Sequence, residues 1–310
     1  MKVSVVVCTY SPNMFTHFIE CVESLLNQTY KNIEIICIVD GNRGYFEMIK
    51  ERKGELFKER GIKLLLNSKN LGLLESRNRG ARLATGDIIA FIDDDAIAEK
   101  NWIKELVKMY RMGAIAAGGK LLPLWIAKKP RWLPEEFYWL IGATHLGFPE
   151  EVTEVRNTFG SNLSFRRDVF LELGGFNTRM GGIKGSKMLQ GGETELCERM
   201  RRKYGRGVMY NPNAIVYHKI FERRTKICFL VKRAFWQGYS KAVMKSVVKK
   251  IDEEKDFLKY LLIDRTTARL GGFIRGSVED LSKLAFIWLF TLLVGVGYTY
   301  GRLTKSLKVH

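Results

Sequence analysis

Short apolar runs alternate with longer amphipathic stretches over the first 95 residues of the chain. Four of the runs have the length and β-branched content of buried strands, at residues 2–8, 33–39, 62–66 and 87–92. Three segments between them are predicted to be helices, at residues 12–27, 45–60 and 71–84. Strands that alternate with helices predict βαβ units, and therefore an α/β fold with a mostly parallel sheet.

The pattern changes past residue 115. Residues 115–165 are irregular and rich in proline and aromatic side chains, which is typical of a lid or acceptor wall over a sheet edge. Further strands are predicted at residues 162–166 and 215–218, and further helices at residues 168–173, 193–204 and 225–283. The predicted parts are an α/β domain at 1–220, basic helices at 221–283, an apolar helix at 284–301 and a basic tail at 302–310.

The apolar segment 284–301 contains no charged residue. As a helix it would be about 27 Å long, just enough to cross the hydrocarbon core of a bilayer. Trp288, Tyr298 and Tyr300 could serve as interfacial aromatic residues. A buried core helix and an obliquely inserted or re-entrant helix are the alternatives.

The net charge of +18 is concentrated toward the C-terminus. Residues 219–310 hold 19 Lys and Arg against 8 Asp and Glu. Nucleic acids and anionic membranes are the usual partners of such a surface. Because no RNA-binding signature or zinc-finger spacing is present, we expect a membrane partner and no nucleic acid.

Other motifs narrow the function classes. The five cysteines include no CxxC pair, which predicts reduced thiols and argues against a disulfide framework or a zinc site. A GxGxxG motif after the first strand and a GxxxxGK[ST] motif are both missing, so neither a dinucleotide fingerprint nor a P-loop is supported.

Three consecutive aspartates, Asp93, Asp94 and Asp95, follow the apolar run at 87–92. Carboxylates this close repel one another unless a cation lies among them. In open α/β sheets, ligands bind beyond the carboxyl ends of the strands. The spacing allows Asp93 and Asp95 to reach one divalent ion and leaves its other positions for phosphate oxygens. The alternative is a solvated acidic turn that caps a helix near Asn101.

Five segments spread over most of residues 1–240 resemble the family 2 nucleotide-sugar glycosyltransferases. They are VSVVVCTYS (3–11), SLLNQTYKNIEIICIVDGN (24–42), NLGLLESRNRGARLATGDIIAFIDDDA (70–96), GSNLSFRRDVFLELGGF (160–176) and NPNAIVYHK (211–219). Their order and spacing together make the resemblance specific. It implies a GT-A fold, which is Rossmann-like, a UDP-sugar donor and a divalent metal cofactor, Mn²⁺ or Mg²⁺.

The resemblance implies a metal site of Asp93, Asp95 and His218. A metal there would act as a Lewis acid and hold the leaving diphosphate, and imidazole is a ligand compatible with manganese. For His218 taken alone, a structural histidine is the alternative. The nucleotide-binding residues that the resemblance implies are Thr9, Tyr10, Asp40, Arg77, Asp93 and Asp94.

Two of these nucleotide contacts have simpler alternatives. Asp40 resembles the acid of the family that contacts uracil, but it could also be a turn residue before Gly41. Arg77 could face the nucleotide or be an arginine on a helix surface.

An inverting transfer needs one general base on the acceptor hydroxyl. The family usually supplies it from a Glu-Asp pair that opens a helix, and alignment without gaps places Glu193 at the base position. Because Gly192 replaces the first acid of the pair, Glu195 is the second candidate. The alternative is that both glutamates stabilise the N-terminus of the helix.

The acceptor and lipid contacts are less sharply indicated. Trp236, Gln237 and Asn162 are candidates to contact the acceptor or the pyrophosphate, and a core-facing aromatic stripe is the alternative for the 236–239 segment. Arg156 and Arg179 are available for a donor carboxylate. Arg223 and Arg224 are candidates to bind a lipid phosphate, and a solvated helix face is the alternative for them.

A closer resemblance reaches the C-terminus. FYWLIG (137–142), EVRNTFGSN (154–162), FWQGYSKAVM (235–244) and VGVGYTYG (294–301) are similar to archaeal glycosyltransferases of protein N-glycosylation. The resemblance implies transfer of a sugar, glucuronate being one candidate, to a dolichyl-phosphate-linked sugar. It also implies a location at the cell membrane, with the catalytic domain on the cytoplasmic side. The alternatives are transfer directly to dolichyl phosphate, a nucleotidyltransferase-like reaction, or a catalytically idle membrane scaffold.

Overall fold

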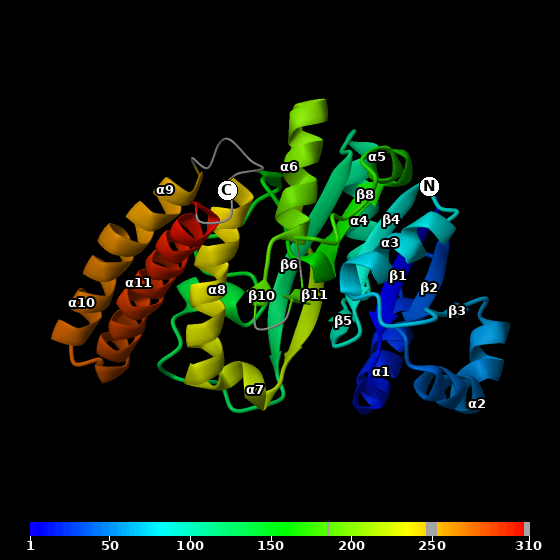
Figure 1. Ribbon diagram of the computed structural model, residues 1–310, viewed down its shortest axis with the longest axis horizontal. Coiled ribbons are helices and arrows are strands. Elements are labelled where there is room, and N and C mark those ends of the chain that lie inside the picture. The colour runs from blue at the N-terminus through cyan, green and yellow to red at the C-terminus, as the bar shows by residue number, and fades with distance from the viewer. Residues whose placement is uncertain (181, 185–186, 246–252, 307–310) are drawn as a thin grey trace. The chain divides into compact units, whose positions relative to one another are not determined.

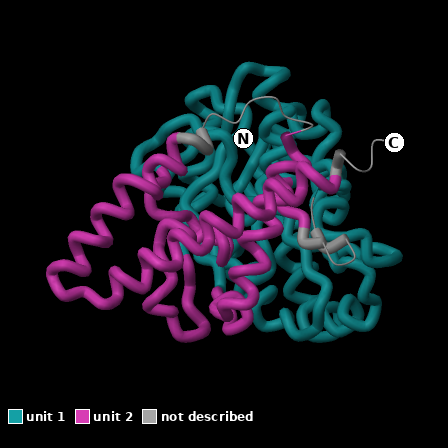
Figure 2. Tube along the Cα trace, turned by 60° about the vertical axis from the view of Figure 1, so that its left-hand side comes forward, with its two compact units in different colours: residues 1–122, 149–182, 192–219 teal, residues 123–148, 183–191, 220–310 magenta. Residues whose placement is uncertain are grey.

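The computed structural model describes residues 1–180, 182–184, 187–245 and 253–306. The chain divides into two compact units, which Figure 2 distinguishes by colour. Unit 1 comprises residues 1–122, 149–182 and 192–219, and unit 2 comprises residues 123–148, 183–191 and 220–310. Each unit is therefore assembled from three separate stretches of the chain.

A sheet of nine strands forms the framework of unit 1 (Figure 1). Its strands are β1 (Val3–Thr9), β2 (Ile33–Val39), β3 (Lys63–Leu66), β4 (Ile88–Asp93), β5 (Ala96–Ala98), β6 (Ala116–Trp125), β7 (Thr153–Val155), β8 (Leu163–Arg166) and β11 (Val208–Ile220). They lie in the order β3-β2-β1-β4-β8-β6-β11-β5, and β7 pairs with β11. A separate two-stranded sheet consists of β9 (Gly182–Lys184) and β10 (Lys187–Leu189).

The sheet is mixed, and only its first half is parallel. β1 pairs in parallel with β2 and β4, and β2 pairs in parallel with β3, as the βαβ pattern predicted. β8 pairs antiparallel with both β4 and β6, and β11 pairs antiparallel with β5 and β7. The prediction of a mostly parallel sheet thus fails past β4, because antiparallel strands need no crossover helix and leave no alternating pattern in the sequence.

The sequence pattern did not predict β5 and β6, and each strand has a local reason for this. β5 is only three residues long. β6 contains Gly118 and Gly119, which break the apolar pattern. A Cβ atom at Gly118 would lie 2.1 Å from Thr158 Oγ1, and one at Gly119 would lie 1.9 Å from the carbonyl oxygen of Ala214. Glycine is therefore required here by close packing, against the usual preference of strands for branched residues.

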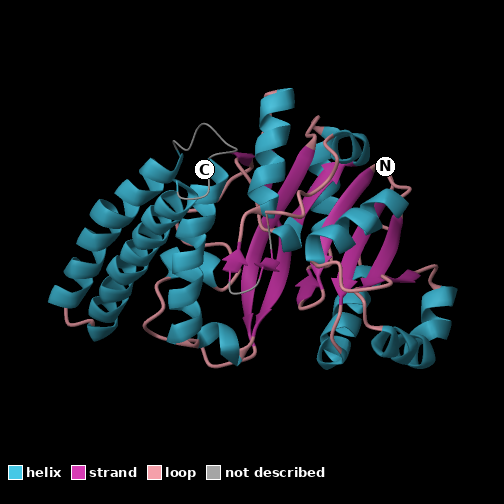
Figure 3. Ribbon diagram, viewed as in Figure 1, coloured by secondary structure: helices cyan, strands magenta, loops and turns pink. Residues whose placement is uncertain are grey.

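Helices cover both faces of the sheet in unit 1 (Figure 3). One layer consists of α1 (Phe15–Leu26), α2 (Arg43–Glu59) and α4 (Trp102–Arg111), whose apolar side chains pack with Val3, Val5 and Val7 of β1. The other consists of α3 (Leu73–Leu83), α5 (Arg167–Glu172) and α6 (Gly192–Tyr204), which pack with Val6 and Cys8. Successive side chains of β1 point to opposite faces of the sheet, so this strand contributes to two separate apolar cores.

Short helical turns complete unit 1. The 3₁₀ turn η1 (Pro12–Met14) leads into α1, and η3 (Gly160–Asn162) leads into β8. The backbone N–H of Asp93 donates to the Ser161 side chain at 3.0 Å, so η3 lies directly against the end of β4.

Apart from β10 and most of β9, the described residues of unit 2 are mainly helical. Those within 225–283 agree with the predicted helices, and residues 246–252 of that range lie outside the described residues. The helical elements of unit 2 are the 3₁₀ helix η2 (Glu135–Leu140), α7 (Glu222–Thr225), α8 (Ile227–Lys245), α9 (Glu253–Lys259), the π-helical turn η4 (Tyr260–Arg265), α10 (Thr266–Ile274) and α11 (Val278–Ser306). A third apolar core joins η2, α8 and α11 through residues such as Phe137, Leu230 and Phe290. Among the described residues, α11 is the one helix long and apolar enough to cross a membrane.

Candidate active site

The three aspartates lie at the carboxyl edge of the sheet, as predicted. Asp93 ends β4, and Asp94 and Asp95 form the turn into β5. The backbone N–H of Lys219 in β11 donates to the carbonyl of Asp95 at 2.9 Å. This pairing brings His218 beside the turn, with its Nε2 atom 3.3 Å from Asp95 Oδ1. The fold therefore places together two of the three residues expected to hold a metal.

Without a bound cation, the negative charges of the acidic turn are unfavourable. Burial raises the pKa of Asp94 to about 7, with further contributions from the neighbouring charges of Asp95 and Asp93, while a hydrogen bond with Thr9 opposes the shift. A carboxyl group whose charged form is disfavoured by burial and by neighbouring carboxylates gains from any cation that enters the cluster. The electrostatics of this turn thus favour a bound cation.

His218 supports the same interpretation. It is 3% exposed, and its Nδ1 atom is buried without a hydrogen-bond partner. Within the part of the chain that the structure describes, no three His, Cys, Asp or Glu side chains are grouped so as to hold a metal ion. Asp95 and His218 offer two ligands of types that suit Mn²⁺, and phosphate oxygens could fill the remaining positions. The residues present therefore fit a metal that binds together with a nucleotide.

Arg77 lies next to this turn, on α3, and is 2% exposed. Its Nη2 atom donates to Asp93 Oδ1 at 2.6 Å, and its Nη1 atom donates to Glu193 Oε1 at 2.9 Å. Although burial lowers the pKa of Arg77, the carboxylates of Asp93 and Glu193 raise it above its ordinary value, so the guanidinium stays charged. Arg77 thus connects the acidic turn to the residue predicted to be the base.

The ion pair between Arg77 and Glu193 fits against Gly160 in η3 because this residue has no side chain. A Cβ atom built on Gly160 would lie 2.2 Å from Glu193 Oε1 and 2.5 Å from Arg77 Nη1. Sequence reasoning missed this role. Its only signal was the placement of a glycine at the start of the GSN segment, 160–162, which carries no information about what lies opposite.

The two candidate bases differ in their surroundings. Both lie in the first turn of α6. The Glu195 side chain is 2% exposed and makes two hydrogen bonds with the Arg199 guanidinium, at 2.7 and 2.9 Å. The Glu193 side chain is 25% exposed and meets the acidic turn through Arg77. Glu193 is therefore the one of the two with access to a reacting hydroxyl.

The remaining nucleotide candidates lie around the ends of β1 and β2. Tyr10 is 60% exposed, while Thr9 is buried with its Oγ1 atom 3.4 Å from the Tyr45 hydroxyl. The Asp40 carboxylate accepts hydrogen bonds at 2.8 Å from the Asn67 side chain and the backbone of the 71–72 segment. Asp40 thus already anchors the loop before α3, and its contact with uracil stays a prediction.

Asn162 is placed differently from the expected acceptor contact. It is completely buried, and its side chain accepts from Trp102 Nε1 at 2.8 Å. Its amide nitrogen donates to the carbonyls of Lys120 at 3.0 Å and Ala214 at 2.7 Å. With three internal hydrogen bonds, this side chain ties β6 and β11 to α4, which supports a structural role.

Other candidates are distributed over both units. Trp236 and Gln237 are half-buried on α8 in unit 2, and the Trp236 ring packs 5.1 Å from that of Tyr239. Arg156 forms an ion pair with Glu198 at 2.8 Å, and Arg179 is exposed. In unit 2, Arg223 is exposed and Arg224 donates to the carbonyl of Ile141. Their proposed ligand contacts stay predictions.

Comparison with known proteins identifies a family model and a relative that aligns over almost the whole chain. The model of glycosyl transferase family 2 matches residues 4–174. A glucosyl-dolichyl phosphate glucuronosyltransferase from Haloferax volcanii is 46% identical over 311 aligned residues, which cover 99% of this chain and 98% of the relative.

Two solved structures share the arrangement of elements. The mannosyltransferase PcManGT from Pyrobaculum calidifontis, in complex with GDP-Man and Mn²⁺, aligns with a TM-score of 0.58 and 16% identity, covering 99% of this chain and 87% of that one. GalNAc-T7 with UDP, GalNAc and Mn²⁺ aligns with a TM-score of 0.57 and 17% identity, covering 83% of this chain and 53% of that one.

Proposed function

Because the chain belongs to glycosyl transferase family 2 and has the GT-A fold, we propose that it transfers a sugar from a UDP-sugar to a dolichyl-phosphate-linked sugar. The 46% identity with the Haloferax volcanii enzyme, over nearly the full length of both chains, is the observation that carries this proposal. The name of that relative specifies a glucuronosyl donor and a glucosyl-dolichyl phosphate acceptor, so glucuronate is the first donor sugar to test.

In the proposed reaction, Glu193 accepts the proton of the acceptor hydroxyl as the hydroxyl oxygen attacks the anomeric carbon of the donor. The bond between that carbon and the diphosphate breaks, and UDP leaves from the opposite side with inversion of configuration. Arg77 holds the Glu193 carboxylate at 2.9 Å, which fixes its direction before the acceptor arrives. A base placed in this way typically contributes a factor of about 10²–10⁴ to the rate.

The developing charge on the diphosphate is the second requirement of the reaction. Mn²⁺ or Mg²⁺, held by Asp95 and His218 with Asp93 beside them, would neutralise that charge as a Lewis acid. The two related structures that contain Mn²⁺ together with a nucleotide or nucleotide sugar support this choice of cofactor. Thr9, Tyr10, Asp40 and Asp94 complete the proposed nucleotide site.

We also propose that the protein works at the cell membrane, with its catalytic domain on the cytoplasmic side, where nucleotide sugars are made. The apolar helix α11 and the lipid-linked substrate of the relative support membrane association. All the residues assigned above to chemistry lie in unit 1, which supports the proposal of a catalytic domain ending near residue 220.

The test is a panel of UDP-sugars, including UDP-glucuronate, assayed for UDP release with dolichyl-phosphate-glucose in the presence of Mn²⁺ or Mg²⁺. Three variants accompany the wild type: Glu193→Gln, Asp95→Asn and, as a control on the exposed surface of α2, Glu47→Gln. We expect release with one donor, a loss of at least about 100-fold in Glu193→Gln, and no change in the control.

Each alternative has a distinct result. Full activity of Glu193→Gln would move the base elsewhere, with Glu195 next to be tested. Release with dolichyl phosphate in place of the glucosylated lipid would show direct transfer to the lipid phosphate. A folded protein that binds none of the UDP-sugars with either metal would refute the proposal.

A further inference from the structure

The helix α11 has two different faces within unit 2. One face is buried, with Ile287 and Phe290 completely inaccessible. The Phe290 ring lies 5.4 Å from that of Phe137, and the Phe286 ring lies 4.3 Å from that of Trp132. Although α11 is apolar enough to cross a bilayer, this face is therefore already occupied by protein.

The neighbouring helix α8 approaches α11 with its backbone. A Cβ atom on Gly238 would lie 1.9 Å from the carbonyl oxygen of Val294, and one on Gly297 would lie 1.9 Å from that of Phe235. Further along, Gly301 faces Ala242, so the two helices run in the same direction side by side. No lipid chain fits between helices in such contact.

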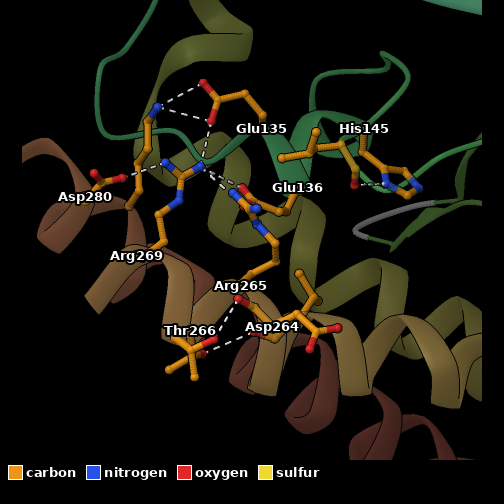
Figure 4. Close-up of polar contacts among 12 residues, drawn as sticks. Glu135, Glu136, His145, Asp264, Arg265, Thr266, Arg269 and Asp280 are labelled. Carbon is orange, nitrogen blue, oxygen red and sulfur yellow. Dashed lines mark hydrogen bonds and ion pairs between the residues drawn. The ribbon is translucent and has the colours of Figure 1, made fainter. Parts of the chain in front are cut away.

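A network of charges fixes the start of α11 to η2, as Figure 4 shows. Lys283 of α11 bonds to the Glu135 carboxylate at 2.9 and 3.1 Å. Arg269 of α10 bonds to Glu135 at 3.0 Å and to Asp280 at 2.7 Å. Glu136, which is completely buried, accepts from Arg265 and Arg269. Removing one partner from such a buried network costs about 3–5 kcal/mol, so α11 is firmly held within unit 2.

This attachment makes a spanning position costly. A bilayer around α11 would also surround α8, which carries four basic residues: Lys232, Arg233, Lys241 and Lys245. A single Lys or Arg at the centre of a membrane helix costs about 2.5–3.5 kcal/mol on insertion scales. The basic composition of α8 thus opposes insertion of the pair across the hydrocarbon core.

The opposite face of α11 is apolar and exposed. Trp288 is 49% exposed, Leu292 64% and Val296 48%. Between Leu281 and Gly301 the one charged residue is Lys283, which is buried. The turn from α10 adds Ile274 and Val278, which are 82% and 74% exposed. An uncharged exposed face of this length marks an interaction site.

Charge identifies the kind of partner. Residues 219–310 hold 19 basic against 8 acidic residues, and Arg275 and Arg302 are exposed at the two ends of the apolar face. A second copy of this chain would bring the same positive charge and be repelled. An anionic lipid surface would attract the positive charge of this region, and the half-exposed ring of Trp288 suits the headgroup region.

We propose that the outer face of α11 docks unit 2 onto an anionic membrane with the helix lying in the plane of the interface, so that the protein is attached to one leaflet without crossing it. This deepens the membrane attachment included in the proposed function. It stands on unit 2 alone, and its test uses neither a nucleotide nor an acceptor.

Flotation of the full chain with vesicles tests the docking. We compare phosphatidylcholine vesicles with vesicles that also contain phosphatidylglycerol. Leu292→Glu places a charge on the exposed face, and Met112→Glu, at a residue 70% exposed in unit 1, is the matched control. We expect binding to require phosphatidylglycerol, to fall about tenfold or more in Leu292→Glu, and to be unchanged in Met112→Glu.

Labelling of single cysteines tests the orientation. Four native cysteines are buried and Cys228 is exposed, so the starting variant is Cys228→Ser. Ser282→Cys and Thr304→Cys then flank the uncharged part of α11, about 33 Å apart along the helix. On sealed vesicles, a membrane-impermeant maleimide added outside should label both positions to the same extent before detergent is added.

Several results would overturn the proposal. Protection of one of the two positions until detergent is added would show that α11 crosses the bilayer. Equal binding to neutral vesicles would remove the requirement for an anionic surface. A dimer that Leu292→Glu converts to a monomer, with vesicle binding unchanged, would make a second copy the partner of this face.

Discussion

Arg77 on α3 and Glu193 on α6 form an ion pair with nitrogen and oxygen 2.9 Å apart, although 116 positions of the chain separate them. The other nitrogen of the same guanidinium holds Asp93 at the end of β4. A planar guanidinium fixes the directions of both carboxylates at once, which the ammonium group of lysine does not do. The proposed base and the proposed metal site therefore share one support.

Replacing Arg77 should affect both catalysis and folding. We expect Arg77→Gln to lower kcat by about 100-fold, because Glu193 loses its fixed position, and to destabilise the protein by about 3 kcal/mol. Arg77→Lys keeps the positive charge but lacks the second nitrogen of the guanidinium, so its kcat and stability should lie between those of the wild type and Arg77→Gln. Steady-state kinetics and thermal unfolding measure both effects. An Arg77→Gln variant that is less stable but keeps the wild-type kcat would show that the bridge is purely structural.

Gly160 provides a way to displace the same pair without removing it. The atoms that a Cβ atom would meet are the ends of two side chains, so the bridge should move while the backbone stays in place. We expect Gly160→Ala to lower kcat by about tenfold or more and to change the unfolding free energy by less than about 2 kcal/mol.

The control for Gly160→Ala is Gly54→Ala in α2, where a Cβ atom meets nothing within 4 Å. This change should stabilise the helix by up to about 1 kcal/mol and leave kcat unchanged. Equal kinetics of the two variants would mean that the Arg77–Glu193 geometry does not limit the reaction.

The contact of α8 with α11 gives a matched pair of substitutions in one helix. Gly297→Ala forces the two backbones apart and should lower the unfolding free energy by about 1–3 kcal/mol. Gly295→Ala meets nothing within 4 Å and should be neutral or stabilising by up to about 1 kcal/mol. Chemical denaturation in detergent measures both. A Gly297→Ala variant as stable as Gly295→Ala would contradict the close crossing.

Glu34 on β2 should make the stability of unit 1 sensitive to acid. Burial alone would raise its pKa, but hydrogen bonds from Lys63, Ser4 and Thr85 lower the pKa from 4.5 to about 2. Since the folded pKa is depressed, the stabilisation is complete above pH 4.5 and is lost as the pH falls toward 2.

We therefore expect Glu34→Gln to be less stable than the wild type by about 1–3 kcal/mol at neutral pH, with the difference disappearing near the folded pKa. Unfolding by urea at a series of pH values measures this difference. The exposed Glu55→Gln on α2 serves as the control. A difference between Glu34→Gln and the wild type that is independent of pH would exclude this ionic contribution.

Much of the acidic edge could be predicted because it follows from strand order. A buried strand that ends in Asp93 must present the next two aspartates at the carboxyl edge of the sheet. The contact of His218 with Asp95 was expected only from the resemblance, since the antiparallel register of β11 with β5 leaves no trace in a single sequence. The bridge through Arg77 was not foreseen, because it requires α3, α6 and η3 to meet.

The apolar helix shows a different limit of sequence reasoning. An amphipathic helix reveals its buried side through the spacing of polar residues, but residues 284–301 have no charged side to mark. Length and composition therefore identified the helix without indicating that Ile287 faces a protein core while Leu292 faces outward. Only packing against α8 and η2 distinguishes the two faces.

The assembly of unit 1 from three stretches of chain has a consequence for its synthesis on the ribosome. The first stretch ends at Leu122 and contains the aspartates, but α6 and β11, which carry Glu193 and His218, emerge much later. Until Lys219 leaves the exit tunnel, the acidic turn of the nascent chain lacks these partners, and the edge of the sheet is incomplete. Since α11 follows Lys219 by more than 50 residues, unit 1 can complete its folding before α11 emerges from the tunnel.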